Sequence, residues 1–326
     1  MRRRDFIGAI YGAAAALPFG AAAQQPGKLW RIGDLHPGPP AVMRIYAQAL
    51  ERSLADFGYV QGRNIELLIR YTCWQLEEMQ EAITSLLPQV DLLVVWGNVA
   101  IEARKLTSAV PTVFISVGYP VELGLAQGLA YPGGNMTGIT AEAALETNGK
   151  RLQILKEIVP DLNRVAVLRD IDIRQWGFEW TALDQAAHEL GVTLVFFDIK
   201  SADDLEGAFA SMKTSDAKAL FVTRTALTFN TGKQIADLAL AARLPSYHAF
   251  REAVMAGGLV SLGPDRVAMA RPAAAQIDKI IKGMSPADIP VEQPTVYELY
   301  INLKTVRLLN LTIPPALLAL ADKVIE

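Results

Sequence analysis

The feature that most constrains the fold of this chain is a spacing of strands and helices that occurs twice. Short runs rich in Val, Ile and Leu alternate with segments of helical period, a pattern typical of α/β proteins with mainly parallel sheets. Residues 31–58 and 164–191 each span 27 positions, and residues 58–111 and 191–245 span 53 and 54. The spacing predicts two similar doubly wound lobes.

Each half is predicted to contain the same succession of elements. Strands of the first half are expected at 30–35, 65–71, 91–96 and 112–116. Strands of the second half are expected at 164–168, 193–199, 219–223 and directly after Pro245. Doubly wound sheets bind ligands in the loops beyond the carboxyl ends of their strands. Two such lobes facing each other would therefore hold a ligand between them.

The chain is expected to cross between the lobes more than once, which makes a hinge. We assign residues 29–142 and 257–293 to the first lobe, since a strand at 258–262 and a long helix at 265–282 are expected to pack there. Residues 143–256 form the second lobe. A further strand is expected across the hinge at 296–301, and the lobe to which residues 294–326 belong is left open.

The first 23 residues have the layout of a cleaved secretory signal. Three arginines at 2–4 precede an Ala/Gly-rich apolar stretch, and the alanines at 21–23 supply the small residues of a cleavage site. The paired arginines before Phe6 resemble a twin-arginine export signal. Glycines and a proline interrupt the apolar stretch, and a spanning helix needs about 20 apolar residues. We expect cleavage after Ala23 and a periplasmic protein.

Composition excludes several classes of function. The formal net charge of −3 and the pI of 5.8 give no basic field for nucleic acid. Cys73 is the only cysteine, so no internal disulfide forms, and we expect an inert residue. The three histidines show no metal-ligand spacing, and dinucleotide, phosphate-loop and hydrolase motifs are missing. No cofactor is expected.

Three strings, taken in order along the chain, resemble one family. They are Tyr-Pro-Gly-Gly-Asn-Met-Thr-Gly at 131–138, Ala-Gly-Gly-Leu-Val-Ser-Leu-Gly-Pro at 256–264 and Ile-Asn-Leu-Lys-Thr at 301–305. Together they are similar to ABC-transporter substrate-binding proteins of the tryptophan/tyrosine-uptake type, which have the type I periplasmic-binding-protein fold. The resemblance covers the whole chain, but residues 169–176 stand where members often have an Asn/Pro-rich loop. The identity of the solute is therefore not carried over.

The resemblance implies a periplasmic protein that binds an amino acid or similar small solute, without chemistry on it, and delivers it to an ABC permease with ATPase subunits. We expect a monomer. A solute-sensing module of a signalling system is the alternative, and a two-lobed α/β enzyme is a weaker one. A DNA-binding repressor of the same fold would need a DNA-reading segment where the export signal lies.

The loop at 35–40 is the first candidate for a ligand-binding segment. It precedes a helix whose free N–H groups and dipole would favour a carboxylate or another anion. Within it, Gly38 is a candidate, and His36 either donates a hydrogen bond to ligand or is a solvated loop histidine.

Two further loops of the first lobe follow predicted strands. Gly97 and Asn98 open a helix, so Asn98 either caps that helix or binds solute. Ser116 and Tyr119 follow the next strand, and Tyr119 either contacts ligand or packs across the hinge.

The first candidates of the second lobe follow its first strand. Asp170 and Asp172 either accept from an ammonium group of the solute or pair with Arg169 and Arg174. Trp176 is the candidate for an aromatic wall.

Later strand ends of the second lobe supply the remaining candidates. Arg224 and Thr225 follow a strand, and arginine suits a bidentate contact with a carboxylate. Of Tyr247, Phe250 and Arg251, we expect one to contact the ligand.

Overall fold

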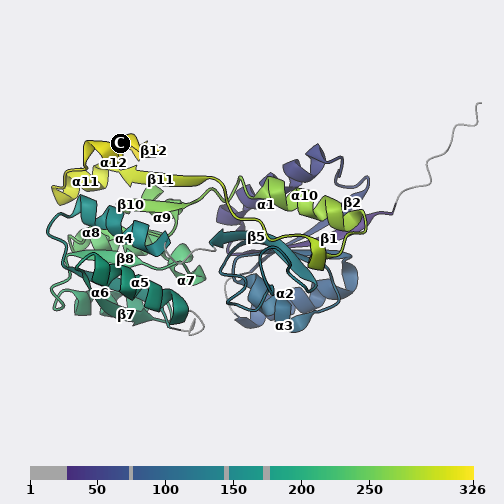
Figure 1. Ribbon diagram of the computed structural model, residues 1–326, viewed down its shortest axis with the longest axis horizontal. Helices are drawn as coiled ribbons and strands as arrows, with labels where there is room; N and C mark the ends of the chain where they lie inside the picture. Colours follow the sequence, from purple (N-terminus) through teal and green to yellow (C-terminus); the bar gives the residue numbers. More distant parts are fainter. Residues whose placement is uncertain (1–27, 73–75, 143–146, 172–176) are drawn as a thin grey trace, which may run out of the picture.

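The computed structural model describes residues 28–72, 76–142, 147–171 and 177–326 and consists of two α/β lobes joined side by side (Figure 1). The predicted export signal therefore lies outside the described residues. In the described ranges every helix is too short or too polar to cross a bilayer. No group of three His, Cys, Asp or Glu side chains there is arranged to hold a metal ion.

The first lobe is built on a five-stranded parallel sheet with the order β2-β1-β3-β4-β5. Its strands are β1 (Trp30–Pro37), β2 (Ile65–Thr72), β3 (Leu92–Trp96), β4 (Thr112–Gly118) and β5 (Met136–Glu142). One face is covered by α1 (Pro40–Asp56) and α10 (Ala270–Ile281), and the other by α2 (Leu76–Leu86) and α3 (Val99–Leu106). Almost continuous apolar strands such as β3 suit a sheet that is buried on both faces.

The second lobe is built on a seven-stranded sheet with the order β12-β11-β10-β9-β8-β6-β7. Its strands are β6 (Arg164–Asp170), β7 (Thr193–Ile199), β8 (Ala219–Val222), β9 (Ser246–Tyr247), β10 (Val260–Pro264), β11 (Tyr297–Asn302) and β12 (Lys323–Ile325). All neighbouring strands are parallel except β10 and β11, which pair antiparallel.

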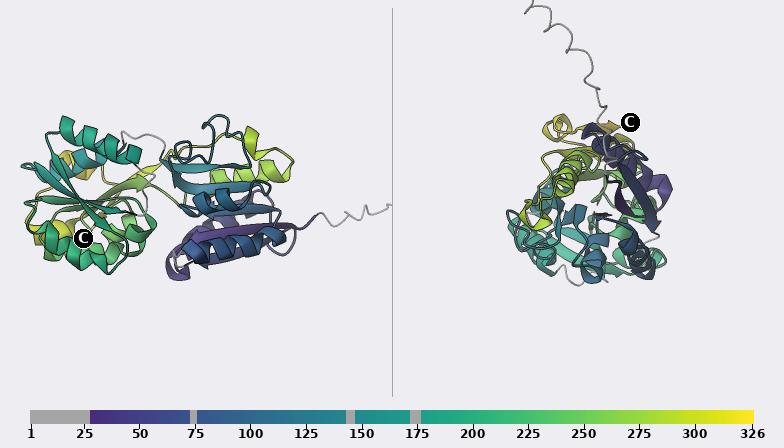
Figure 2. Two further views of the ribbon diagram at one scale, coloured as in Figure 1. Left: turned by 90° about the horizontal axis from the view of Figure 1, so that it is seen from below. Right: turned by 90° about the vertical axis from the view of Figure 1, so that its right-hand side faces the viewer.

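Helices cover both faces of this second sheet as well. On one face lie α4 (Thr147–Ile158), α5 (Gly177–Glu189), α11 (Leu303–Leu309) and α12 (Pro315–Ala319). On the other lie α6 (Asp204–Met212) and α8 (Gly232–Ala241), and the short helices α7 (Ala226–Asn230) and α9 (Arg251–Met255) complete the lobe. Figure 2 shows the two sheets and their covering helices from two further directions.

The strand order of the two sheets confirms the predicted repeat. Strands β7-β6-β8-β9-β10 of the second lobe have the same order as β2-β1-β3-β4-β5 of the first. The assignment of residues 257–293 to the first lobe is wrong at its start, because β10 pairs with β9 and β11 of the second sheet. Strand β10 is the counterpart of β5 in the first lobe, and the predicted repeat of four strands per lobe included neither of them as its fifth strand. The helix expected at 265–282 begins only at Ala270 and packs against α1 of the first lobe.

Three crossings connect the lobes (Figure 1). The chain passes from β5 to α4, returns from β10 to α10, and passes again from the 3-10 turn η3 (Pro286–Asp288) to β11. Before this last crossing, Glu292 exchanges backbone hydrogen bonds of 2.9 and 3.0 Å with Thr140 and Gly138 of β5. The C-terminal elements from β11 onward all belong to the second lobe, whose sheet they extend.

We expect Gly138→Ala to lower the free energy of unfolding by about 3 kcal/mol, because overpacking of a closed core is costly. A Cβ atom at Gly138 would lie 2.0 Å from the backbone oxygen of Phe114 in the neighbouring strand. Gly134, in the same sequence string, has no atom within 4 Å of such a Cβ and provides the matched control, Gly134→Ala. Urea unfolding measures both variants, and equal effects would contradict this reason for the glycine.

Candidate functional site

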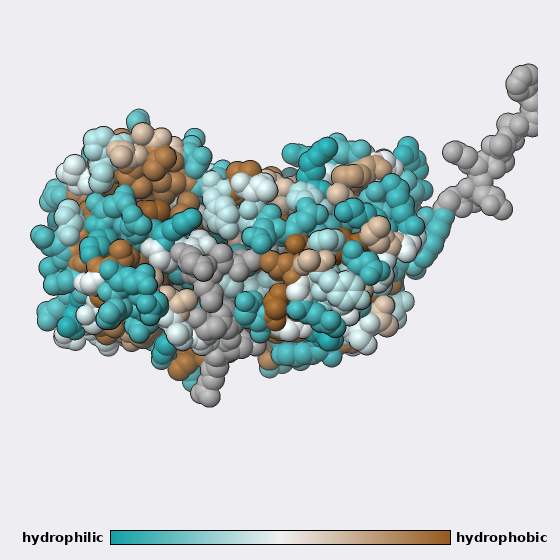
Figure 3. Space-filling model, viewed as in Figure 1, coloured by the Kyte–Doolittle hydropathy of each residue, from teal (hydrophilic) through white to brown (hydrophobic). Residues whose placement is uncertain are grey.

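A cleft between the two lobes is lined by the loops at the carboxyl ends of their strands. The first lobe contributes Pro37, Gly97, Asn98, Ser116 and Gly118, and the second contributes Arg224, Thr225, Ala226, Phe229 and Phe250. The segment that crosses between the lobes after β10 contributes Arg266. The upper edge of the molecule dips between the lobes (Figure 3). The cavity volume of the cleft is about 40 Å³, which is enough for about three water molecules. The cleft is therefore narrow in this structure.

Two arginine side chains give the cleft its charge. Arg224 and Arg266 are both only 8% exposed, although each lines the cleft. Arg224 donates from Nη2 to the backbone oxygen of Ala249 at 3.1 Å, while its Nε has no hydrogen-bond partner. Arg266 has no partner at Nε or Nη1. Burial, followed by repulsion from Arg151, lowers the pKa of Arg224. Buried donors of this kind are costly unless an acceptor pairs with them.

Aromatic rings surround these guanidinium groups. The central carbon of the Arg266 guanidinium lies 4.4 Å from the ring centre of Tyr46 and 4.8 Å from that of Phe229. Phe250 lies between the two arginines, with its ring centre 5.0 Å from Arg224 and 5.6 Å from Arg266. Phe229 and Phe250 meet edge to face at 4.9 Å. The cleft thus combines an apolar wall with two cationic hydrogen-bond donors, a combination that suits a carboxylate on an apolar body.

The loops of the first lobe at the cleft have unusual backbone conformations. Ser116 has a φ of 62°, and the pairing of β4 with β5 shifts register beside it. Gly97 has a φ of 56°. A non-glycine residue at positive φ stores strain, which is common where a side chain is positioned for a ligand. The bulge turns Ser116 out of the regular ladder and onto the cleft wall.

The side chain of Asn98 does not cap α3, although the residue stands at the N-cap position. No hydrogen bond joins it to the first turn, and the residue lines the cleft instead. The predicted capping bond is thus not made, and contact of Asn98 with solute stays a prediction.

The structure does not place His36 or Gly38 on the cleft wall. The ring of His36 stacks against Trp96 at 5.2 Å and Tyr71 at 5.4 Å, and its Nε2 lies 2.8 Å from Asp34 Oδ2. The side chain is fully buried, so it is not a solvated loop histidine either. The backbone N–H of Gly38 donates to Thr72 at 2.7 Å.

The helix start behind this loop has few free N–H groups for an anion. Prolines at 37, 39 and 40 have no N–H, and those of Val42 and Met43 donate to the oxygen of Pro39. The prolines therefore weaken the anion site predicted at this helix start.

Two tyrosines named as candidates lie away from the cleft. Tyr119 is buried between the lobes, where its hydroxyl lies 3.4 Å from Asn148 Nδ2, so the hinge-packing role fits its position. Tyr247 belongs to the second core, stacking on Phe221 and donating to the oxygen of Leu262 at 2.9 Å. Both hydroxyls are buried, and burial raises the pKa of each tyrosine.

Three candidates follow the first strand of the second lobe, and the structure describes only one of them. Asp172 and Trp176 lie outside the described residues. Asp170 is half-buried at the end of β6 and does not line the cleft, and Arg169 pairs with Asp198.

Arg251 lies beside the cleft and is already paired with carboxylates. Its guanidinium donates to Glu298 and, at 3.4 Å, to Asp265. Glu252 accepts from the hydroxyl of Tyr46. Arg251, Glu252 and Glu298 line a second, smaller hollow together with Arg224, Phe250 and Arg266 of the cleft.

Sequence reasoning missed Phe229 and Arg266. Arg266 follows β10, the fifth strand of the repeat, which the predicted succession of four strands does not include. Arg266 follows β10 much as Arg224 follows β8, so a strand assigned correctly would have indicated it.

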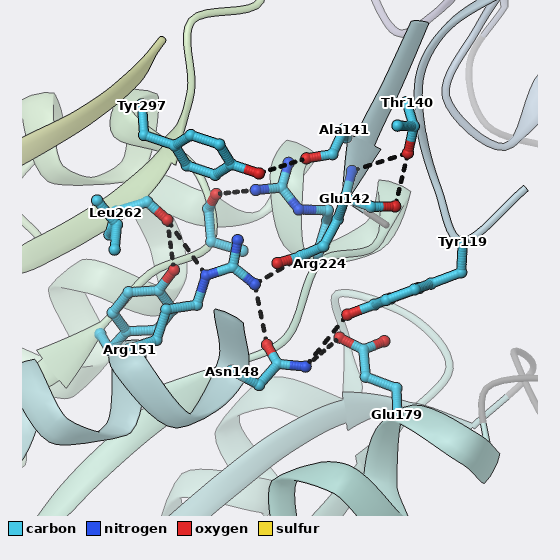
Figure 4. A network of polar contacts seen from close by, with 12 residues as sticks. Tyr119, Thr140, Ala141, Glu142, Asn148, Arg151, Glu179, Arg224, Leu262 and Tyr297 are labelled. Carbon is cyan, nitrogen blue, oxygen red and sulfur yellow. Dashed lines mark hydrogen bonds and ion pairs between the residues drawn. The ribbon is translucent and has the colours of Figure 1, made fainter. Parts of the chain in front are cut away.

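A buried polar network ties the crossings of the hinge together (Figure 4). Nη1 of Arg151 donates to Glu142 Oε2 at 2.8 Å and to Asn148 Oδ1 at 2.9 Å, and its Nε donates to the oxygen of Leu262 at 3.2 Å. Glu142 ends β5 and Leu262 lies in β10, so a side chain of α4 links the first two crossings. Burial acts to lower the pKa of Arg151, but the attraction of the neighbouring Glu142 carboxylate is stronger. The pKa of the arginine is therefore raised.

Glu179 extends this network from the first turn of α5. Asn148 Nδ2 donates to Glu179 Oε1 at 3.1 Å. Burial, and then repulsion from Glu142, raises the pKa of Glu179 to about 7. The folded protein therefore retains this proton at a pH where the unfolded chain releases it, and the contribution of Glu179 to stability falls as the pH rises from 4.5 to about 7.

We expect Glu179→Gln to have a higher free energy of unfolding than the parent at pH 8. The difference between the variant and the parent should be about 2 kcal/mol larger at pH 8 than at pH 5. The amide oxygen can still accept from Asn148, while the ionisation that costs stability at high pH is removed. Urea unfolding at the two pH values measures the margin. A margin that does not change with pH would show that Glu179 does not titrate in this range.

Comparison with known proteins places the chain in a family. Residues 39–325 match the model of the family described as ABC transporter substrate binding protein, and the chain belongs to this family. A tyrosine-binding protein of Clostridioides difficile is 22% identical over 278 residues, which cover 85% of this chain and 78% of that protein.

Similar solved structures include the following two. A conserved domain protein of Vibrio cholerae has a TM-score of 0.84 at 22% identity, and the match covers 91% of this chain and all of that one. The ABC domain of Streptococcus pneumonia in complex with L-Trp has a TM-score of 0.83 at 21% identity, with the same coverage. The fold is therefore that of periplasmic binding proteins of type I.

Proposed function

We propose that this chain is the periplasmic component of an ABC importer, that it binds a small carboxylate-bearing solute between its lobes, and that it delivers this solute to a permease. The observation that carries the proposal is the pair of buried arginines, Arg224 and Arg266, whose unpaired N–H groups lie at the cleft beside two phenylalanine rings. An amino acid or an aromatic carboxylate has the matching chemistry.

The comparisons support the amino-acid class. One similar protein is named for binding tyrosine, and a similar structure contains L-Trp. Both solutes combine a carboxylate with an aromatic body, which the arginines and phenylalanines of the cleft would contact. The proposed role is binding without chemistry, as in the similar substrate-binding proteins.

Closure of the lobes is the proposed mechanism of recognition. A solute that contacts both lobes stabilises the state in which they are closed, and the permease recognises the surface of that state. Asn98 and Ser116 would provide the contacts of the first lobe, and Arg224 and Thr225 those of the second. A solute sensor that signals to a membrane kinase would use the same closure, and neighbouring permease and ATPase genes distinguish the importer.

A thermal-shift screen tests the ligand class. The mature chain, residues 24–326, is heated with amino acids, aromatic carboxylates, sugars or purines. We expect only carboxylate-bearing compounds to raise the melting temperature, since a ligand present at 100 times its Kd adds about 2.7 kcal/mol to the stability. A rise with a sugar or purine and none with any carboxylate would overturn the proposal.

A further inference from the structure

We infer that Glu252, on α9, binds the ammonium group of the solute and selects a zwitterionic α-amino acid over a carboxylate that lacks this group. The inference rests on the proposed function, because it names the partner for the second charge of a solute whose carboxylate pairs with Arg224 and Arg266. It concerns the second hollow beside the cleft.

The second hollow adjoins the cleft and is small. It shares Arg224, Phe250 and Arg266 with the cleft, and Glu252 lies on its wall. Its cavity volume of about 10 Å³ gives room for about one water molecule. An ammonium group has about this size. Only one carbon atom separates the two charged groups of an α-amino acid, so a carboxylate on the shared arginines brings the ammonium group to this hollow.

The two glutamates of the second hollow differ in how well their charge is neutralised. Glu298 accepts from Arg251, which also donates to Asp265 at 3.4 Å. Glu252 accepts from the hydroxyl of Tyr46, a neutral donor, and its nearest contact with Arg251 is 4.0 Å. A carboxylate has about four acceptor sites, so an ammonium group can bind while Tyr46 remains. Glu252 is therefore the better acceptor for a cation.

The unpaired donors of the shared arginines point to a ligand independently of the glutamates. Nε of Arg224 and both Nε and Nη1 of Arg266 have no hydrogen-bond partner, although each side chain is only 8% exposed. A bound carboxylate would satisfy these donors through charge-assisted hydrogen bonds. It would also offset the two positive charges beside Glu252, so that an ammonium group is attracted to the glutamate.

The charges around the second hollow balance before solute binds. Its described lining residues and the partners of its arginines supply three guanidinium groups and three carboxylates, those of Arg224, Arg251, Arg266, Glu252, Glu298 and Asp265. A zwitterion preserves this balance. A carboxylate alone leaves one negative charge in excess, and an amine alone leaves one positive charge, which is costly in a site with little water.

The place of Glu252 also connects this contact to closure of the lobes. Glu252 lies on α9 of the second lobe and Tyr46 on α1 of the first, so their hydrogen bond joins the lobes (Figure 1). A purely structural role of Glu252, acting through this bond, would change the affinity for every solute by the same factor. Binding of the ammonium group would instead change the preference between solutes, and this difference separates the two roles.

Titration calorimetry on the mature chain tests the inference with matched solutes. The pairs are L-phenylalanine with 3-phenylpropanoate, and L-tyrosine with 3-(4-hydroxyphenyl)propanoate, at one pH and one salt concentration. Each pair differs only in the ammonium group. We expect the amino acid of each pair to bind at least about tenfold more tightly, which corresponds to about 1.4 kcal/mol. The control 2-phenylethylamine lacks the carboxylate, and we expect no measurable binding of it.

Glu252→Gln tests the residue itself. We expect this variant to lose the preference, so that the affinities within each pair differ by less than about threefold, because the amide has no charge to pair with the ammonium group. Glu298→Gln is the matched control in the same hollow. It should retain the preference, since the charge of Glu298 is already paired with Arg251. Thermal unfolding shows whether each variant is folded.

The outcomes separate the inference from the proposed function. Equal or tighter binding of the deaminated compounds by the parent overturns the inference and leaves the proposed carboxylate site intact. A preference for the amino acids that persists in Glu252→Gln also overturns it, because another group then binds the ammonium. If no carboxylate binds to the parent, or 2-phenylethylamine binds as tightly as L-phenylalanine, the proposed function itself is wrong. The comparison on the parent needs no variant, so it remains decisive if Glu252→Gln does not fold.

Discussion

Replacing Arg266 with methionine is expected to weaken binding of 3-phenylpropanoate by about 100-fold without destabilising the ligand-free protein. The loss of affinity follows because truncating one partner of a buried, hydrogen-bonded charge pair costs about 2–5 kcal/mol. The ligand-free protein loses a buried cation with two unpaired N–H groups, while the methionine still fills the space beside Tyr46 and Phe229. Calorimetry measures the affinity, and thermal unfolding measures the stability.

Arg271→Met is the matched control for this variant. Arg271 lies on α10 with a side chain that is 70% exposed and pairs with Asp56 at the surface. We expect this change to leave the affinity within about twofold of the parent, since exposed ion pairs contribute little. The role of Arg266 would be wrong if Arg266→Met lowered the melting temperature strongly but left the affinity unchanged.

Replacing Arg151 with methionine is expected to lower the free energy of unfolding by about 3–5 kcal/mol. The side chains of Arg151 and Glu142 are only 2% and 1% exposed, so the variant leaves a carboxylate buried without its cation. It also removes the donors to Asn148 and to the oxygen of Leu262, which connect two crossings of the hinge. Urea unfolding gives the change directly.

The double variant Glu142→Gln/Arg151→Met distinguishes the charge pair from simple packing. Because it removes both charges, we expect it to be more stable than Arg151→Met alone. If instead the double variant loses the sum of the two single effects, the pair is not coupled. A loss below about 1 kcal/mol for Arg151→Met would contradict a buried ion pair at the hinge.

Much of the fold could be predicted because local patterns repeat. The strands expected at 193–199 and 65–71 match β7 and β2 to within a residue, since Val, Ile and Phe runs bounded by turn residues are strong local signals. The strand β5, by contrast, carries Thr and Gly at 137, 138 and 140 and has no apolar run. Strand β5 forms because it pairs with β4, and this pairing between distant segments is not visible in the local sequence.

The site could be predicted less well, for a physical reason. Strand ends indicate which loops reach the cleft, and this gave Gly97, Asn98, Ser116, Arg224 and Phe250 as candidates that the structure brings to its wall. Sequence does not show which way a side chain points once the chain folds. His36 turns into a ring stack over Trp96, whereas Arg266 reaches the cleft from the segment that crosses between β10 and α10.

The most direct test of a solute bound between the lobes is a distance between them, measured by pulsed electron paramagnetic resonance. Spin labels at exposed positions Arg104 on α3 and Asp184 on α5, introduced as cysteines with Cys73 replaced by serine, report on opposite lobes. We predict that saturating 3-phenylpropanoate shortens and narrows the distance distribution, and that the Arg266→Met variant at the same concentration does not respond. An unchanged distribution in a sample shown by calorimetry to be saturated would contradict binding in this cleft.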